Sequence, residues 1–373
     1  MDIRKLSHLL IVIVLTGFLL IQGKQFVLPI VFAFMLALLM NPIHSYFQPR
    51  IKPNWLSIIV SFLVVIVPVL ASFFLFGMQL KGALDEIPVV TERGGELINE
   101  AFGWLAEKFQ LSKQDSIDFI VENLTSSIDK PVGVFASGLT ESTGFFANLL
   151  LTFLFAFFFL LYKKGLKNFI VQQTEDHRKD NVQDMVTGIQ HVTQQYLYGL
   201  LMVIIILGLL NSIGLMIIGV DYAFFWGFLA AFLAVIPYIG TIIGGLLPFL
   251  YTLATTDTTW QPLAVIGLFV VVQAIEGNLI TPKIVGNSVK LNPFAAILSL
   301  IFGQIMYGIA GMILALPILA IIKVVLDHID VTKPLGFLIG DELSEKPNAF
   351  FEKWDDNKYR LSSLISKKTR RQE

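Results

Sequence analysis

Long apolar runs, each with at most one charged residue, recur along this chain. Six of them are candidates for single membrane-spanning helices: 6–21, 26–40, 56–77, 145–162, 199–219 and 263–280. Roughly 20 apolar residues in a helix cross the hydrocarbon core of a bilayer. Lipid offers no hydrogen-bond partner to backbone N–H and C=O groups, so each run is predicted to be helical. The predicted fold class is therefore all-α, a polytopic integral membrane protein, in agreement with a hydrophobic fraction of 55%.

Two further apolar stretches, 223–254 and 294–325, are too long for one straight span and too short for two. Pro-Tyr-Ile-Gly at 237–240 interrupts the first, and several glycines between 303 and 311 interrupt the second. Each is predicted to form a helical hairpin, re-entrant or fully spanning, which gives about eight membrane segments in total. A full span precedes each hairpin, so the two halves resemble a repeat. Paired Gly/Pro-interrupted segments of this kind indicate the binding region of a transporter.

Lys and Arg residues set the predicted orientation, because cytoplasmic loops carry an excess of them. Cationic residues near 4–5, 50–52, 163–167 and 367–371 all fall on one side when the spans are counted. Both termini are therefore predicted to be cytoplasmic. The chain divides into N-terminal membrane helices (1–80), an extracytoplasmic insert of amphipathic helices (81–144), a membrane core (145–326) with a cytoplasmic loop (163–195), and a charged cytoplasmic tail (327–373).

Residues typical of enzymes are missing from the sequence. It has no Cys, which excludes disulfides and thiolate metal sites. Its five His residues are scattered, and no phosphate-binding Gly-Lys-Ser/Thr loop or Gly-x-Ser-x-Gly elbow occurs. The sequence also lacks the basic patch of a nucleic-acid-binding protein. These patterns argue against an enzyme and predict neither a cofactor nor a resident metal.

Glu276 stands at the end of the apolar run 263–280. A carboxylate at membrane depth costs about 2.5–3.5 kcal/mol on insertion scales, so such a group usually faces a cavity, a partner or a pathway. Gln273 precedes it by one turn, and Asn278 and Pro282 follow. Together these groups are predicted to bind a solute, a proton or a Na⁺ ion. The structural alternative is that Glu276 pairs with a nearby lysine, Lys283 or Lys290, or caps the second hairpin.

The hairpins supply the remaining candidate residues. In the first, small residues from Gly240 onward favour close helix packing, and an unwound backbone that faces the substrate is the alternative. In the second, a proline suits the first turn of a helix, because its missing N–H needs no partner there. The candidate residues of the two hairpins are Pro237, Tyr238, Gly240, Pro293, Gln304, Gly308, Gly311 and Pro317.

Several motifs, in order, resemble those of the autoinducer-2 exporter (AI-2E) family. They are Pro-Tyr-Ile-Gly at 237–240, Glu-Gly-Asn-Leu-Ile-Thr-Pro-Lys at 276–283, Lys-Leu-Asn-Pro at 290–293, Tyr-Gly-Ile-Ala-Gly at 307–311 and Leu-Pro at 316–317. The resemblance implies a bacterial cell-membrane protein with about eight membrane segments, assembled as a homo-oligomer such as a pentamer. It also implies export of a small polar signal molecule or, as in some relatives, Na⁺(Li⁺)/H⁺ exchange. One departure is Leu200, because relatives often carry Gln after the preceding Tyr-x-x-Gly.

Three functional hypotheses follow. The first is a secondary transporter that exports a small polar solute, with Glu276 and the hairpins forming its gate. The second is a cation/proton antiporter in which Glu276 binds Na⁺ and H⁺ competitively. The third is an oligomeric membrane scaffold or regulator, against which the costly carboxylate of Glu276 argues. The sequence leaves open the choice between the first two, the solute, the coupling ion and the direction of flux.

Overall fold

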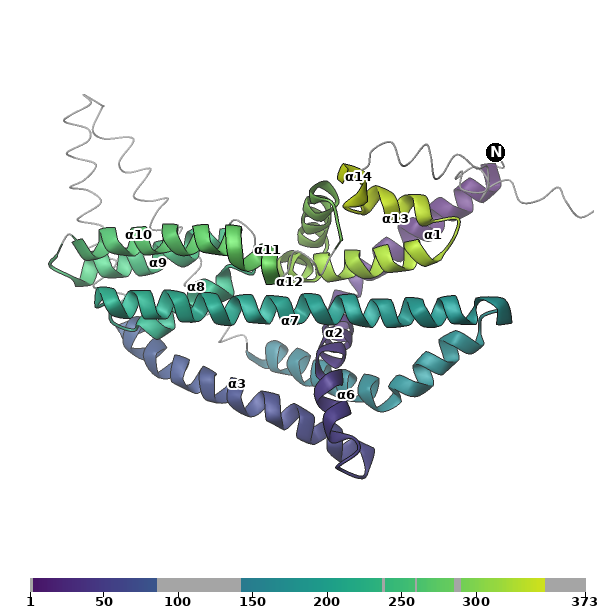
Figure 1. Ribbon diagram of the computed structural model, residues 1–373, viewed down its shortest axis with the longest axis horizontal. Helices are drawn as coiled ribbons and strands as arrows, with labels where there is room; N and C mark the ends of the chain where they lie inside the picture. The colour runs from purple at the N-terminus through teal and green to yellow at the C-terminus, as the bar shows by residue number, and fades with distance from the viewer. Residues whose placement is uncertain (1–2, 86–141, 237–238, 259, 285–289, 346–373) are drawn as a thin grey trace, which may run out of the picture. The chain divides into compact units, whose positions relative to one another are not determined.

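The computed structural model describes residues 3–85, 142–236, 239–258, 260–284 and 290–345 (Figure 1). Helices form every regular element within these ranges, and one isolated antiparallel bridge joins Leu291 to Gly340. The predicted all-α fold is therefore confirmed. Most of the predicted extracytoplasmic insert (81–144) and of the charged tail (327–373) lies outside the described residues.

Six of the described helices are long and apolar enough to cross a membrane: Lys24–Phe47, Asn54–Gln79, Phe146–Gln172, Asp176–Ile218, Trp260–Ile284 and Pro293–His328. The first predicted span, 6–21, forms a separate helix, α1 (Ile3–Gln22). The predicted cytoplasmic loop 163–195 is helical for most of its length. Only a short stretch separates α6 (Ser142–Gln172) from α7 (Lys179–Ile218), and it contains the 3₁₀ turn η1 (Asp176–Arg178).

The chain divides into two compact units. Unit 1 comprises Met1–Val64, Asn148–Leu200 and Pro282–Glu373, and unit 2 comprises Val65–Ala147 and Leu201–Thr281. Unit 1 contains α1, α2 (Lys24–Phe47), the start of α3 (Asn54–Asp85), most of α6, the first half of α7, α12 (Pro293–His328), α13 (Lys333–Ile339) and α14 (Glu342–Glu345). Unit 2 contains the remainder of α3 and α7, α8 (Ala223–Leu233), α9 (Ile239–Thr255), α10 (Trp260–Ile275) and η2 (Glu276–Ile280).

The first predicted hairpin consists of α8 and α9. Its glycines bring the two helices into contact: a Cβ on Gly240 would lie 1.6 Å from the Leu233 carbonyl oxygen, and one on Gly244 would lie 2.9 Å from the Cα of Ala230. Only glycine permits so close an approach of two backbones. Pro237 and Tyr238, which were predicted to turn this hairpin, lie outside the described residues.

The second predicted hairpin is α12, which changes direction at Gly308. This residue has φ 63° and ψ −144°, a backbone conformation that residues other than glycine rarely adopt. On either side of the turn, Gly303 and Gly311 face each other so closely that a Cβ on Gly311 would lie 2.1 Å from the Gly303 carbonyl oxygen. The two halves of α12 therefore fold back against each other, as the glycine pattern predicted.

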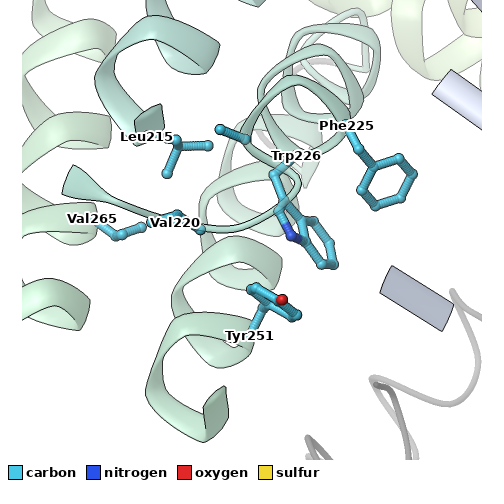
Figure 2. Packing of buried hydrophobic residues seen from close by; sticks show 7 residues of the cluster. Leu215, Val220, Phe225, Trp226, Tyr251 and Val265 are labelled. Carbon is cyan, nitrogen blue, oxygen red and sulfur yellow. The ribbon is translucent and has the colours of Figure 1, made fainter. Parts of the chain in front are cut away.

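The core of unit 2 gathers around aromatic residues of α8 and α9 (Figure 2). Its buried members are Leu215, Val220, Ala223, Phe225, Trp226, Tyr251 and Val265. The Trp226 and Tyr251 rings lie 5.2 Å apart between centroids. Next to Trp226, the backbone of α8 meets that of α7, because a Cβ on Gly227 would lie 2.4 Å from the Ser212 backbone nitrogen. This helix crossing depends on Gly227.

Replacing Gly227 with Ala is predicted to destabilise the protein by about 1–3 kcal/mol, because a methyl group inserted against backbone forces the helices apart. Gly267→Ala in α10 is the matched control, since its Cβ would meet nothing within 4 Å. That change should be neutral or stabilising by up to about 1 kcal/mol through helix propensity. Thermal unfolding in detergent measures the change in stability of both variants. Equal effects of the two substitutions would contradict the packing role of Gly227.

Candidate functional site

Glu276 lies where the α10 helix changes its hydrogen-bond register. The α-helical part ends at Ile275, and Glu276–Ile280 forms a π-helical turn. The Thr281 backbone N–H bonds to the Glu276 carbonyl, five residues earlier. Pro282 explains the change locally, because it has no N–H and its ring clashes with the carbonyl four residues before it. A single π-helical turn within an α-helix is rare and often marks a functional site.

Both carboxylate oxygens of Glu276 accept hydrogen bonds within unit 2. Gln273 Nε2 donates to Oε2 at 2.9 Å, and the Thr281 hydroxyl donates to Oε1. The carboxylate side chain is half-buried, whereas Gln273 is exposed. Both donors are uncharged, so they stabilise the carboxylate without neutralising it. Neither of these bonds comes from a lysine.

Thr281 is the member of this cluster that the sequence did not reveal. Residues on one face of an α-helix are three or four positions apart, which favoured Gln273 and not a residue five positions further on. The π-helical turn closes at five residues and brings the Thr281 hydroxyl to the carboxylate. Asn278 takes a different position, since its Nδ2 donates to the Ala274 carbonyl at 2.8 Å. Proline at 282 is the sequence signal that could have indicated the altered register.

The other predicted site residues occupy varied positions. Gly240 is buried against α8, and Gly311 and Pro317 are buried within α12. Gln304 is exposed, Pro293 is the first residue of α12, and Gly308 forms its turn. Pro282 and Lys283 are exposed in α11 (Thr281–Ile284). The residues from 282 onward belong to unit 1, whereas Gln273, Glu276 and Thr281 belong to unit 2.

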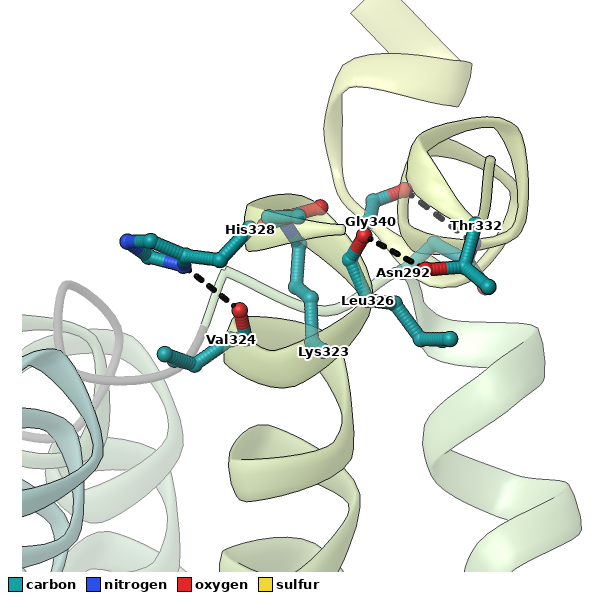
Figure 3. A network of polar contacts seen from close by, with 8 residues as sticks. Asn292, Lys323, Val324, Leu326, His328, Thr332 and Gly340 are labelled. Carbon is teal, nitrogen blue, oxygen red and sulfur yellow. Dashed lines mark hydrogen bonds and ion pairs between the residues drawn. The ribbon is translucent and has the colours of Figure 1, made fainter. Parts of the chain in front are cut away.

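Asn292 closes the base of the second hairpin (Figure 3). Its side-chain oxygen accepts from the Ala295 N–H at 2.8 Å and so caps α12. Its Nδ2 donates to the carbonyls of Leu338 at 2.8 Å and Gly340 at 3.1 Å, at the end of α13. Its own N–H donates to the Ile339 carbonyl at 3.0 Å. This buried residue therefore joins the start of the hairpin to the segment that follows its end, and we call this contact the Asn292 clasp.

The far end of the hairpin is held in the same region. Lys323 and Asp327 form an ion pair at 2.6 Å one turn apart. The Thr332 hydroxyl donates to the Leu326 carbonyl at 3.0 Å, and Asn181 of α7 donates to the His328 carbonyl at 2.8 Å. Figure 3 shows Asn292 beside these last turns of α12. The base of the hairpin is consequently a dense set of side-chain-to-backbone bonds.

Comparison with protein families decides the identity of the chain. The sequence model of the AI-2E transporter family matches residues 9–330. This chain belongs to the AI-2E family. AI-2E transporters are membrane transport proteins, and the six long apolar helices of this member agree with a multi-pass arrangement.

Relatives of this AI-2E protein align over most of their length. YrrI of Bacillus subtilis is 26% identical over 326 residues, covering 82% of this chain and 87% of that protein. The AI-2 transport protein TqsA of Escherichia coli is 24% identical over 321 residues, covering 86% and 90% respectively. A transport-protein relative from Haemophilus influenzae is 26% identical over 342 residues, covering 89% and 94%.

Two substitutions at Asn292 separate the two roles of the Asn292 clasp. Asn292→Asp keeps the oxygen that caps α12 but has no N–H for the Leu338 and Gly340 carbonyls. Asn292→Ala loses both functions. We expect Asp to increase amide hydrogen exchange in α13 alone, and Ala to increase it in α13 and in the first turn of α12.

The loss of stability should be larger for Ala, because a lost cap costs about 0.5–2 kcal/mol in addition to the unpaired carbonyls. Hydrogen exchange with mass spectrometry resolves both segments. Asn168→Ala, at an exposed position of α6, is the control and should leave both unchanged. Unchanged exchange of α13 in Asn292→Asp would refute the Asn292 clasp.

Proposed function

We propose that this AI-2E protein is a secondary transporter that exports a small polar solute resembling autoinducer-2 from a bacterial cell, with Glu276 as its binding group. The family supports membrane transport. The relative TqsA is named an AI-2 transport protein, which supports this class of solute. The Lys/Arg distribution supports cytoplasmic termini, and the family resemblance supports a homo-oligomer such as a pentamer.

The observation that carries the proposal is the hydrogen bonding of Glu276. Its carboxylate is half-buried at the end of an otherwise uncharged apolar helix, and two uncharged donors hold both of its oxygens. A buried structural carboxylate usually has a cationic partner, because an unneutralised charge is costly in a low-dielectric environment. The negative charge of Glu276 therefore remains available to a solute or cation that enters the site.

Neutral donors also fit a hydroxylated solute. An O–H of the solute can take the place of the Gln273 amide or the Thr281 hydroxyl on the carboxylate, and the displaced group can bond to the solute in turn. Exchange of one hydrogen bond for another changes the free energy little. Such a site binds reversibly, as transport requires. It also binds a solute that carries hydroxyl groups more readily than an apolar solute.

A second candidate function is exchange of Na⁺ or Li⁺ for protons at the same carboxylate. Carboxylate, hydroxyl and amide oxygens are the ligands that hard cations prefer, and Glu276, Thr281 and Gln273 supply one of each. Glu276 would then bind the cation and the proton in alternation. The grouping of these three side chains favours this second reading as well, so an experiment must distinguish the two.

Replacing Glu276 with Gln should abolish transport while preserving the fold. The substitution keeps the shape but removes the charge, and an amide N–H then faces one of the two donors. Loss of a hydrogen bond to a charged group costs about 1.5–3 kcal/mol, so we expect at least about a tenfold fall in solute flux. Proteoliposomes loaded with autoinducer-2 and assayed for its release measure this flux.

Glu175→Gln is the matched control, because this carboxylate is 74% exposed beside η1 and undergoes the same chemical change. A trapped pH dye and an imposed Na⁺ jump test the second function in the same liposomes. Autoinducer-2 release that Glu276→Gln abolishes supports export. A Na⁺-dependent pH change without release assigns cation exchange instead. Full release by Glu276→Gln would remove Glu276 from the mechanism.

A further inference from the structure

The junction of α2, α3 and α6 carries positive charge without nearby negative charge in sequence. No Asp or Glu occurs between residues 3 and 84 or between 142 and 174. Arg50 and Lys52 lie in the turn between α2 and α3, and Lys163, Lys164 and Lys167 lie on α6. Lys163 bonds to α2 beside His44, which contacts Asn54 at the start of α3, so its charge lies near the turn that carries Arg50 and Lys52. The junction is therefore suited to an anion.

A polar chain of four side chains holds this junction together within unit 1. Lys163 Nζ donates to Asn41 Oδ1 at 2.8 Å and lies 3.1 Å from His44 Nδ1. On the other side of the ring, His44 Nε2 lies 3.1 Å from Asn54 Oδ1, at the start of α3. The His44 side chain is completely buried. Because the Lys163 ammonium can only donate, His44 Nδ1 accepts and His44 Nε2–H donates to Asn54.

This arrangement fixes the orientation of the Asn54 amide. Its oxygen is engaged by His44, so its two N–H donors point away from the buried ring. Asn54 also lines a groove of about 640 Å³ at the α2–α3 turn, together with Gln48, Ile51, Lys52 and Pro53. The groove thus combines an exposed ammonium group with side-chain amides and with the apolar surfaces of Ile51 and Pro53.

The groove lies at the level where a membrane surface is expected. Two apolar helices meet there, because α2 ends at Phe47 and α3 begins at Asn54. Exposed aromatic side chains flank the turn: Tyr46 is 58% exposed and Trp55 is 49% exposed. The Arg50 guanidinium lies 3.9 Å from the centre of the Tyr46 ring. Tyr, Trp and Arg at helix ends are typical of the lipid headgroup region.

An apolar track leads away from the groove along α3. Trp55, Ile59 and Leu63 follow one another at spacings of four residues and are all exposed, so they share one face of the helix. An acyl chain can lie along this face while its headgroup occupies the groove. A free phosphate would use only the polar end of this arrangement.

We propose that the groove binds the phosphodiester headgroup of an anionic phospholipid, with its acyl chain against α3. The Lys52 ammonium supplies the charge, and the amides of Asn54 and Gln48 donate to the phosphate oxygens. Basic pockets between membrane helices are known to bind anionic headgroups in this way. The buried chain from Asn54 through His44 to Lys163 connects the lipid to α2 and α6. The lipid therefore stabilises the packing of three helices, independently of the solute that the protein carries.

Native mass spectrometry of the full-length protein tests the proposal. The protein is incubated in detergent with phosphatidylglycerol or phosphatidylcholine, and the retained lipid is counted. We expect preferential retention of phosphatidylglycerol and about a fivefold weaker retention in Lys52→Gln, the loss expected for one near-surface lysine. Lys24→Gln removes the same charge at the opposite end of α2 and should retain the lipid like the wild type.

Asn54→Asp provides a second variant that keeps the acceptor for His44. It lacks the amide N–H donors and repels the phosphate, so retention should be abolished while thermal unfolding changes little. Equal retention of both lipids by the wild type, or unchanged retention in Lys52→Gln and Asn54→Asp, would overturn the proposal. Displacement of phosphatidylglycerol by millimolar inorganic phosphate would also overturn it and assign the groove to a soluble phosphate compound.

Discussion

Every backbone N–H and C=O group in a membrane must find its partner inside the protein, and this constraint governs the whole chain. Where the helices are regular, the backbone satisfies itself. Where they break, the sequence supplies a specific substitute. Asn292 bonds four backbone groups at the base of the second hairpin through its side chain and its N–H, and the π-helical turn at Glu276 gives the Thr281 N–H an acceptor five residues earlier, directly before Pro282. The interruptions are therefore local solutions to a backbone problem, and polar side chains gather at them for that reason.

The same constraint explains how much the sequence predicted. Apolar runs located the spans, and the breaks within 223–254 and 294–325 indicated both hairpins, because only glycine or proline patterns permit such turns in lipid. Small-residue spacing predicted close packing at Gly240, and the glycines at 303 and 311 marked the interruption of the second stretch; all three lie against backbone in the structure. Whether the two hairpins are related by symmetry is still a prediction.

The polar networks were harder to predict, because they depend on residues far apart in sequence or on an unusual register. In the sequence, His44 is one of five scattered histidines, because its partner Lys163 lies 119 positions away. Asn292 stood next to a helix-starting proline, but its partners Leu338 and Gly340 are 46 and 48 positions later. Thr281 was hidden for another reason, since its contact with Glu276 requires a turn of five residues. Sequence periodicity detects neighbours along one helix and not contacts between helices.

The hydrogen-bond network around Glu276 differs from the network around His44 in the position of its charged group. In the chain from Asn41 to Asn54, both nitrogens of the buried His44 have partners, and the one charge belongs to Lys163, near the end of α2. Such a network is suited to holding helices together. At Glu276 each carboxylate oxygen also has a donor, and within the part of the chain that the structure describes both of these donors are neutral. Completed hydrogen bonding fixes the position of a group, whereas an uncompensated charge requires a counterpart. A rigidly placed carboxylate with neutral partners would suit the role proposed here for Glu276, because a transporter must present the same group to each solute or ion and release it again.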